Sequence, residues 1–240
     1  MAEALAELGA DIVVLDNKEE IVKKQAQKIQ NDFKVRTLPL ALDLANDDQV
    51  RGVAQLVVKE LGRLDILINC AAFVGTSDLK GWITPFLEQQ ADTWRQALDV
   101  NLTAPFVLTQ ACTEALKKSE HGSVINVGST YGVMGPDMSL YEGTQMGNPA
   151  GYAASKGGLI QLTRWLSTVL APSIRVNSIS PGGVWRNQPE SFVNRYVERT
   201  PLKRMASEED FKGAVAFLAS DLSLYVTGQN LMVDGGWTIW

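Results

Sequence analysis

Short runs rich in Val, Ile and Leu alternate with longer helix-forming segments along the whole chain. This alternation constrains the fold more than any other feature of the sequence. The strand-like runs cover residues 11–16, 35–43, 64–69, 123–128, 174–180 and 230–236. Helical patterns of about ten or more residues separate most of these runs, which is typical of βαβ units and a parallel sheet. We therefore predict an α/β fold with a doubly wound, mostly parallel sheet, in a single domain over residues 1–240.

The helix-forming segments are expected to cover both faces of this sheet. We predict helices over residues 18–30, 47–61, 152–170 and 208–220, with one or two more before residue 118. The chain also opens inside a helical pattern, AEALAELG, which Gly9 closes. Long loops are expected before residue 152 and between residues 181 and 207.

The composition argues against several classes of function. The net charge is −5, from 22 basic and 27 acidic residues of interleaved sign, which disfavours nucleic acid or an anionic membrane as a partner. The chain has no run of about 18 apolar residues that would predict a membrane span. Two cysteines, Cys70 and Cys112, and one histidine, His121, are too few for a disulfide framework or a zinc site. We expect a cytoplasmic protein without a metal.

Tyr152 and Lys156 begin a predicted helix with a spacing of four residues. This spacing stacks two side chains on one face of a helix, about 5–6 Å apart at Cβ. A free tyrosine has a pKa near 10, and a nearby cation favours its phenolate, so the pair is suited to acid-base chemistry. The alternative interpretation is an ordinary amphipathic helix with a half-exposed tyrosine and a solvated lysine.

Acidic side chains follow the first two predicted strands. In a doubly wound sheet, ligands bind beyond the carboxyl ends of the strands. Asp16 could accept hydrogen bonds from the two ribose hydroxyls of an adenosine, and it would repel a 2′-phosphate. Asp43, followed by Leu44, could bind the adenine amino group. Either aspartate could instead cap the helix that follows it.

Three polar residues mark the next strands and the helix between them. Asn69 ends a strand and precedes small residues, including Ala71, that would let a ligand approach the backbone, although it could simply terminate the strand. Ser129 could hydrogen-bond a carbonyl oxygen, or it could be a turn serine. Asn101 lies inside a helical pattern, where it suggests a bend or a bound water, or a buried structural amide.

Taken together, the motifs resemble the ordered set of the short-chain dehydrogenase/reductase family. They occur in the family's order as LDILINCAA, DVNLTAPF, SVINVGST, YAASK, IRVNSISPGGV and VTGQNLMVDGG. The resemblance implies a Rossmann-like fold and a catalytic tetrad of Asn101, Ser129, Tyr152 and Lys156. By this resemblance Tyr152 exchanges the proton, Ser129 orients the substrate oxygen and Lys156 lowers the tyrosine pKa and holds the nicotinamide ribose. Asn101 would position a water in a proton relay.

The resemblance also implies a nicotinamide cofactor. Besides Tyr152 and Lys156, the positions that match the family's cofactor contacts are Asp16, Asp43, Leu44, Asn69, Ala71, Gly182 and Val184. The acid at position 16 implies NAD in preference to NADP. A small-molecule substrate is implied, together with a homodimer or homotetramer built through the helices at about 103–118 and 152–170 and through the C-terminal segment.

The sequence departs from the family at its start, where it has no TGxxxGxG loop for the pyrophosphate. The opening helix resembles the second half of the helix that follows that loop. We therefore expect that the natural protein starts upstream, with a strand in the middle of the sheet, and that Met1 is an internal methionine. The intact mass of the native protein tests this expectation.

Two loops depart from the family's usual pattern. The segment between Ser129 and Tyr152 is expanded, and the segment after Val184 carries Arg186 where the family usually has a threonine. Asn187 is a candidate for supplying the missing contact. The polar groups in these loops favour a hydroxylated or anionic substrate such as a sugar derivative; alternatively they are solvated or form subunit contacts. The polar loop groups are Tyr131, Asp137, Tyr141, Glu142, Gln145, Asn187, Gln188, Arg195 and Arg199.

From these observations we predict an NAD(H)-dependent oxidoreductase that interconverts an alcohol and a carbonyl on a polar substrate, such as a sugar or polyol derivative. One alternative is a non-catalytic scaffold or binding protein that has lost the dinucleotide phosphate site, which the missing glycine loop would explain. Another is a 3-oxoacyl reductase, which Asp16 and the polar loop disfavour.

Overall fold

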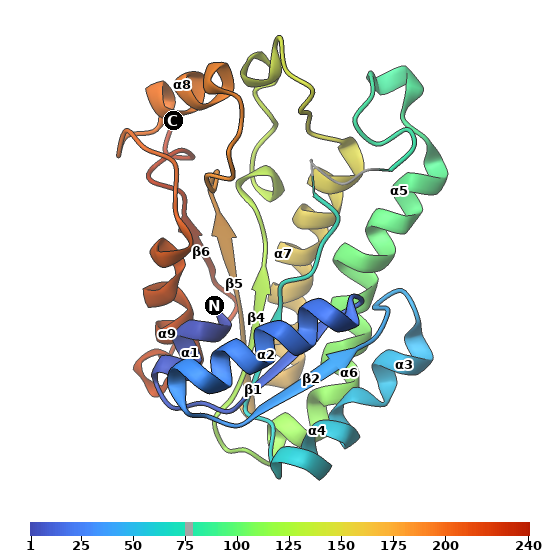
Figure 1. Ribbon diagram of the computed structural model, residues 1–240, viewed down its shortest axis with the longest axis vertical. Coiled ribbons are helices and arrows are strands. Elements are labelled where there is room, and N and C mark those ends of the chain that lie inside the picture. Colours follow the sequence, from blue (N-terminus) through green and yellow to red (C-terminus); the bar gives the residue numbers. More distant parts are fainter. Residues whose placement is uncertain (75–78) are drawn as a thin grey trace.

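The computed structural model describes residues 1–74 and 79–240. All six predicted strands form, and every strand pair is parallel. The strands are β1 (Ile12–Asp16), β2 (Thr37–Ala41), β3 (Ile66–Asn69), β4 (Gly122–Val127), β5 (Ile174–Pro181) and β6 (Asn230–Val233). In the four-stranded sheet the strands run the same way, and the carboxyl ends of β4 and β5 point toward the top of Figure 1. The prediction of an α/β fold with a parallel sheet is confirmed.

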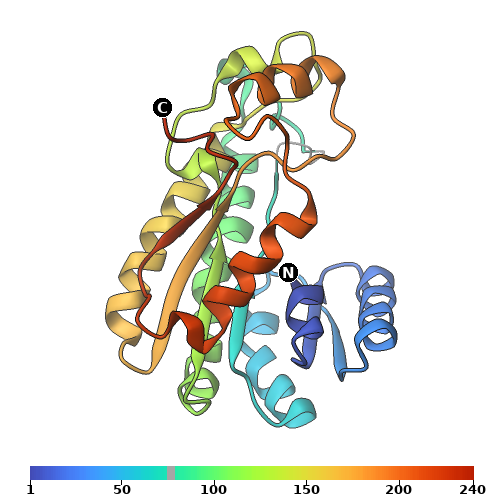
Figure 2. The same ribbon diagram turned by 90° about the vertical axis from the view of Figure 1, so that its left-hand side faces the viewer.

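The strands form two sheets, whereas the sequence predicted one. β1 pairs only with β2, and the other four strands are ordered β3-β4-β5-β6. Between the edges of β1 and β3 lies a cavity of about 700 Å³, lined by both strands from Ile12 to Leu15 and from Ile66 to Asn69. Figure 2 shows the β1–β2 unit standing beside the larger sheet. The cavity occupies the place in the sheet where the family resemblance expects a further strand.

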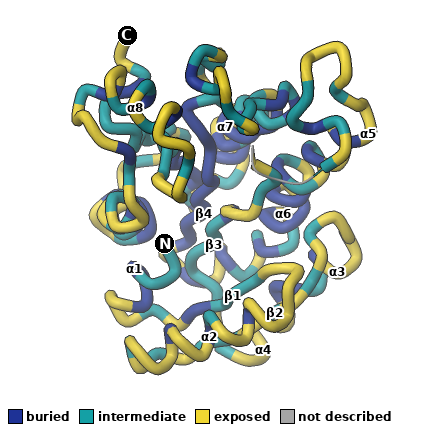
Figure 3. Tube along the Cα trace, turned by 45° about the horizontal axis from the view of Figure 1, so that its top comes forward, coloured by how far each residue is buried: buried dark blue, intermediate teal, exposed yellow. Residues whose placement is uncertain are grey.

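Helices cover both faces of the strands, as predicted for a doubly wound fold. Neighbouring residues of β4 divide between two cores: Val124 packs in a cluster with α3, α4, α6 and α7, and Ile125 in a cluster with α1, α2 and α9. This alternation follows from the strand period of two. The helices are α1 (Ala2–Glu7), α2 (Glu19–Phe33), α3 (Asp47–Arg51), α4 (Val53–Leu61), α5 (Ala91–Leu98), α6 (Ala104–Lys117), α7 (Ala150–Leu170), α8 (Glu190–Arg199) and α9 (Lys212–Ala219). Figure 3 shows β4 buried and the outer face of α2 exposed.

Some helices differ from the prediction. The helix expected over 47–61 is divided at Gly52 into α3 and α4, and the one expected over 208–220 begins as the 3₁₀ turn η5 (Glu208–Phe211) before α9. Helix α8 was predicted to be loop. Its polar sequence obscured a short amphipathic pattern in which Phe192 and Tyr196, four residues apart, are buried. Further 3₁₀ turns are η1 (Phe86–Glu88), η3 (Thr130–Gly132), η4 (Met138–Tyr141) and η6 (Asp221–Ser223).

The expanded loop and α8 pack on one another beyond the carboxyl ends of the strands, at the top of Figure 1. Their shared core contains Leu140 and Tyr141 from the loop, Phe192 and Tyr196 from α8, and Trp237. The rings of Tyr196 and Trp237 stack with centroids 4.4 Å apart. Tyr196 of this cluster accepts a hydrogen bond from the Gly183 N–H, which ties the cluster to the segment after β5.

Within the described part of the chain, none of the helices combines the length and apolarity needed to cross a membrane. The same residues contain no group of three or more His, Cys, Asp or Glu side chains placed to hold a metal ion.

Candidate active site

Tyr152, Lys156 and Ser129 come together at the carboxyl end of β4. Tyr152 and Lys156 lie in the first turns of α7, and the Lys156 Nζ is 5.9 Å from the centroid of the Tyr152 ring. Ser129 follows β4, and its hydroxyl hydrogen-bonds to the Tyr152 phenol. The packing of α7 against β4 and β5 brings these residues together although 23 positions separate Ser129 from Tyr152 (152 − 129).

The titration behaviour of this group is set mainly by burial. Burial raises the pKa of the Tyr152 phenol, and the hydrogen bond from Ser129 opposes that rise. Burial lowers the pKa of Lys156 to about 8. The expected lowering of the tyrosine pKa by Lys156 is not seen, because the Lys156 Nζ donates to the Val127 carbonyl at 2.7 Å and lies nearly 6 Å from the ring.

Asn101 lies in a π-helical turn, η2 (Asp99–Thr103), between α5 and α6. This confirms the bend that its mid-helix position suggested, since π turns insert a residue into the helix. The amide is fully buried, and it accepts from the Phe73 N–H at 2.7 Å and donates to the Phe73 carbonyl and to Ser155 Oγ, each at 3.0 Å. The side chain therefore joins α7 to the loop after β3. A water relay at Asn101 stays a prediction, and it would need another group, such as the main-chain carbonyl.

The Asn69 side chain points into the interior. Its Nδ2 donates to Asn126 Oδ1 at 2.8 Å, and Asn126 in turn donates to Thr163 Oγ1 at 2.8 Å. This buried chain ties β3, β4 and α7 together. A cofactor contact at Asn69 would therefore involve its backbone. The role of Asn126 was not predicted; its position between Val and Ile residues of a buried strand was the available signal.

Asp16 ends β1 and Asp43 follows β2, and both are exposed. Asp16 Oδ1 accepts from the Lys18 N–H at 3.1 Å, so it closes the turn into α2 and leaves its second oxygen to solvent. Asp43 Oδ1 accepts from the Ala45 N–H at 2.9 Å. The cap of α3 is Asn46, and not Asp43, because Asn46 Oδ1 accepts from the N–H of Gln49.

The other predicted cofactor contacts lie near these residues or at the end of β5. Leu44 and Ala71 line the cavity between β1 and β3. Gly182 packs so closely that a Cβ there would come within 2.7 Å of the Asp234 Cα. Val184 forms an isolated parallel bridge with Ala206.

The predicted cofactor contacts fit the two nucleosides of a dinucleotide better than the pyrophosphate between them. Asp16 offers an exposed carboxylate to a ribose, and the small residue Ala71 lines the cavity between β1 and β3, whereas the space beside Gly182 is filled by Asp234 and Tyr196. For the phosphates, the helix after β1 offers the wrong charge, since α2 begins with Glu19 and Glu20. The residues described here therefore account for nucleoside contacts and do not account for a pyrophosphate site.

The arginines of the two variable loops are engaged within the protein. Arg186 pairs with Glu208 at 2.7 Å, and Arg199 pairs with Asp137. Arg195 Nη1 donates to the carbonyls of Ser139, Leu140 and Glu142, at 3.2, 2.9 and 2.8 Å. The contacts of Arg195 and Arg199 hold α8 against the expanded loop. The expectation of a basic surround for an anionic substrate is thus not supported, and the alternative of structural loop residues is favoured.

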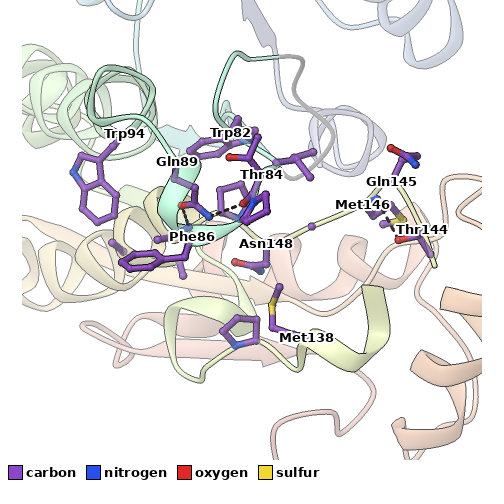
Figure 4. A pocket seen from close by; sticks show the side chains of 18 residues that line it. Trp82, Thr84, Phe86, Gln89, Trp94, Met138, Thr144, Gln145, Met146 and Asn148 are labelled. Atoms are coloured by element: carbon purple, nitrogen blue, oxygen red, sulfur yellow. Dashed lines mark hydrogen bonds between the residues drawn. The ribbon is translucent and has the colours of Figure 1, made fainter. Parts of the chain in front are cut away.

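A second cavity, of about 790 Å³, lies between the expanded loop and the segment before α5. All the residues that line it are uncharged, and they include Trp82, Phe86, Met138 and Asn148. Figure 4 shows Gln89 beside it, bonded to the Thr84 carbonyl at 3.3 Å and to the Ala150 N–H at 3.1 Å. The sequence did not predict this cavity, because its two walls are loops more than 40 residues apart. Loop residues 75–78, close by in the sequence, lie outside the described residues.

The doubly wound fold is typical of proteins that bind dinucleotides, and Tyr152, Lys156 and Ser129 lie together at the carboxyl end of β4. Residues 1–238 match the family model described as enoyl-(acyl carrier protein) reductase. The chain therefore belongs to the short-chain dehydrogenase/reductase family.

Its relatives in sequence have varied roles. The chain is 31% identical over 212 residues to a post-translational flagellin modification protein A from Campylobacter coli, covering 88% of this chain and 81% of the relative. It is 30% identical over 241 residues to a 3-oxoacyl-(acyl-carrier-protein) reductase from Thermotoga maritima, covering 98% and 90%.

Similar solved structures include a gluconate 5-dehydrogenase from Burkholderia cenocepacia in complex with NADP and tartrate. It superposes with a TM-score of 0.87 at 29% identity, covering 100% of this chain and 89% of that one. An NAD⁺-bound xylitol dehydrogenase superposes with a TM-score of 0.86 at 28% identity, covering 98% and 92%.

Proposed function

We propose that the protein is an NAD(H)-dependent oxidoreductase that interconverts an alcohol and a carbonyl on an uncharged, hydroxylated substrate such as a polyol or sugar derivative. One observation carries the proposal: the Tyr152 phenol is buried, hydrogen-bonded to Ser129 and close to the buried Lys156. The polyol part of the proposal is supported by the xylitol dehydrogenase among the structural neighbours. It is also supported by Arg186 and Arg195, which bond within the protein and so do not offer an unpaired charge to an anionic substrate.

The residues divide the proton chemistry among them. When the substrate is oxidised, Tyr152 accepts the hydroxyl proton of the substrate, and in the reductive direction it returns that proton to the carbonyl oxygen. Ser129 donates to the same oxygen and orients it. A nicotinamide, when bound, supplies the hydride acceptor or donor. Lys156, whose Nζ lies 5.9 Å from the centroid of the Tyr152 ring, would hold the nicotinamide ribose, as the family resemblance implies.

The first prediction concerns the proton carrier. Tyr152→Phe is expected to lower kcat by about 10²- to 10⁴-fold, because it removes the group that exchanges the proton and keeps the ring. NADH formation at 340 nm measures the rate, and circular dichroism checks the fold. Tyr225→Phe, at a fully exposed tyrosine, is the matched control. Activity within threefold of wild type in the Tyr152 variant would refute the assignment.

The second prediction concerns the cofactor. Related structures hold either NAD⁺ or NADP, so the preference rests on Asp16. Its exposed carboxylate would repel a 2′-phosphate, and we expect Asp16→Ser to raise the ratio of kcat/KM for NADP over NAD by about tenfold or more. Asp43→Ser, a matched change at the next strand end, should alter this ratio much less. An unchanged ratio in the Asp16 variant would remove the argument for NAD.

A 3-oxoacyl reductase is the second candidate, and the identity to the Thermotoga maritima enzyme favours it. The two candidates differ in substrate: acetoacetyl-CoA for a 3-oxoacyl reductase, xylitol or another polyol for the proposed dehydrogenase. Turnover of acetoacetyl-CoA with no oxidation of any polyol would decide for the reductase. A non-catalytic scaffold would turn over neither, and NADH fluorescence titration would then show whether it still binds the cofactor.

A further inference from the structure

A pair of tyrosine hydroxyls lies beside the catalytic group. Tyr131 follows Ser129 by two residues, and its N–H donates to Ser129 Oγ at 3.2 Å. The Tyr131 Oη is 2.8 Å from the Oη of Tyr141, which lies near the middle of the expanded loop. The Tyr131 phenol also interacts electrostatically with those of Tyr152 and Tyr196. Four phenol groups thus gather in the region beyond the ends of β4 and β5.

Contacts with α8 hold Tyr141 in this position. Its ring packs on Phe192 with centroids 5.4 Å apart. Arg195, one turn further along α8, donates to three carbonyls of residues 139–142, on both sides of Tyr141. Tyr196 accepts from the Gly183 N–H at 2.6 Å, which joins α8 to the end of β5. The Tyr131–Tyr141 pair is therefore held by α8, which is itself bonded to the end of β5.

The hydrogen bonds of this group are incomplete. Two phenols carry two O–H protons, and the bond between Tyr131 and Tyr141 uses one of them. Asn148 donates to Tyr141, yet its own Oδ1 is buried and has no hydrogen-bond partner among the described residues. Over the same residues, the second phenol proton has no hydrogen-bond acceptor. One donor and one acceptor thus stay unpaired on interacting residues, where burial makes unpaired groups costly.

We propose that Tyr131, Tyr141 and Asn148 bind a second oxygen of the substrate, a hydroxyl group additional to the one that reacts at Tyr152. The inference rests on the proposed function and specifies its substrate class as a diol or higher polyol. A hydroxyl accepts from the free phenol proton and donates to Asn148 Oδ1, so it completes both bonds. A carboxylate would place its negative charge against the amide oxygen, and an apolar group would leave both groups unpaired.

The location of Asn148 is consistent with such a role. Asn148 also lines the uncharged cavity beside the expanded loop, where Thr84 Oγ1 is a further buried oxygen without a partner among the described residues. A substrate that reaches from Tyr152 to Asn148 therefore extends toward a site with apolar walls, polar groups and, among the described residues, no charged side chain. This setting suits a neutral molecule with several hydroxyls.

The test uses alcohols that differ by one hydroxyl: 2-butanol against 2,3-butanediol, and cyclohexanol against 1,2-cyclohexanediol. We expect the wild-type enzyme to favour the diol of each pair in kcat/KM. Tyr141→Phe and Asn148→Ala should each lower the diol-to-alcohol ratio about tenfold or more, mainly through KM for the diol. Tyr225→Phe, at a fully exposed site, should leave the ratio unchanged. Tyr141→Phe keeps the ring that packs on Phe192, and circular dichroism verifies the fold.

Two results would overturn the inference: a wild-type enzyme without preference for the diols, or variants in which both members of a pair lose activity equally, as expected for a purely structural loop. Saturation-transfer difference NMR with the same alcohols and NADH reads binding without turnover. Diol-selective binding that Tyr141→Phe abolishes, in an enzyme that oxidises none of the alcohols, would sustain the inference and count against the proposed function. Absence of diol-selective binding would count against the inference itself.

Discussion

At the scale of single residues, the unusual group is a buried cation. Lys156 is 3% exposed, and the carbonyl of Val127 is its hydrogen-bond acceptor. A buried ammonium costs free energy because it has lost the solvation of water. Such an arrangement is typical of functional sites, where it tunes proton affinity at the expense of stability.

The pH dependence of stability tests this arrangement. The folded-state pKa of Lys156 is about 8, below its ordinary value of 10.5, so between these values the unfolded chain binds more protons. Stability conferred at this position therefore rises as pH increases from 8 toward 10.5, and the burial penalty is fully present below pH 8. Relative to Lys156→Met, we expect the wild type to gain about 1–2 kcal/mol in unfolding free energy between pH 7.5 and 9.5.

Urea denaturation of both proteins at each pH gives this difference. Burial raises the pKa of Cys112 to about 12, which acts in the opposite direction above pH 9, but it does so equally in both proteins and cancels. A wild-type-minus-variant difference that stays constant with pH would show that Lys156 is solvated in the folded protein.

At the scale of elements, the notable feature is that β1 and β3 each have an edge without a neighbouring strand. β4 and β5 each pair with a neighbour on both sides, whereas β1 and β3 each pair on one side only. Their other sides face the cavity of about 700 Å³. Unpaired backbone groups at a sheet edge cost free energy when they are buried, and they can bond to solvent when water fills the cavity.

Hydrogen exchange can therefore report how well the backbone amides beside this cavity are protected from solvent. We expect amides of β1 and β3 to exchange at least about tenfold faster than those of β4 and β5, because local opening exposes singly paired strands more easily. Exchange measured by mass spectrometry on short peptides from residues 12–16 and 66–69 gives the comparison. Protection equal to that of β4 would mean that these edges are paired in solution.

At the scale of the whole molecule, apolar side chains stay exposed on the two long helices that were expected to form a subunit interface. On α7, Trp165 and Val169 are 54% and 51% exposed, one turn apart on the same face, and Phe106 on α6 is 38% exposed. Solvent-exposed aromatic groups at such a spacing are typical of interface centres. We therefore expect a homodimer or homotetramer.

Trp165→Asp is expected to shift the assembly toward monomers, because a charge buried at an interface without a partner costs several kcal/mol. Size-exclusion chromatography with light scattering measures the mass. Trp185→Asp is the matched control, since Trp185 is equally exposed at 54% and lies outside α6 and α7. An unchanged mass for Trp165→Asp would exclude α7 as the main interface.

The sequence alone was sufficient for the strands, the order of the elements and the placement of Tyr152 and Lys156 on one helix. β-branched runs identify buried strands because both of their faces are apolar, and a spacing of four places Tyr152 and Lys156 on one helix face whatever lies around them. Helix α8 escaped prediction because burial of Phe192 and Tyr196 depends on a loop about 50 residues earlier. The separation of the sheet between β1 and β3 also became visible only in three dimensions.

The amino-acid sequence by itself thus determined the parallel α/β fold, the family and the Tyr152–Lys156 pair, since each depends on local pattern and fixed spacing. Only the tertiary structure decided what each polar group does. Asn69 and Asn101 form buried bonds, Arg195 clamps a loop, and Tyr131 meets Tyr141. Hydrogen-bond partners distant in sequence are chosen by packing, and no local pattern encodes that choice.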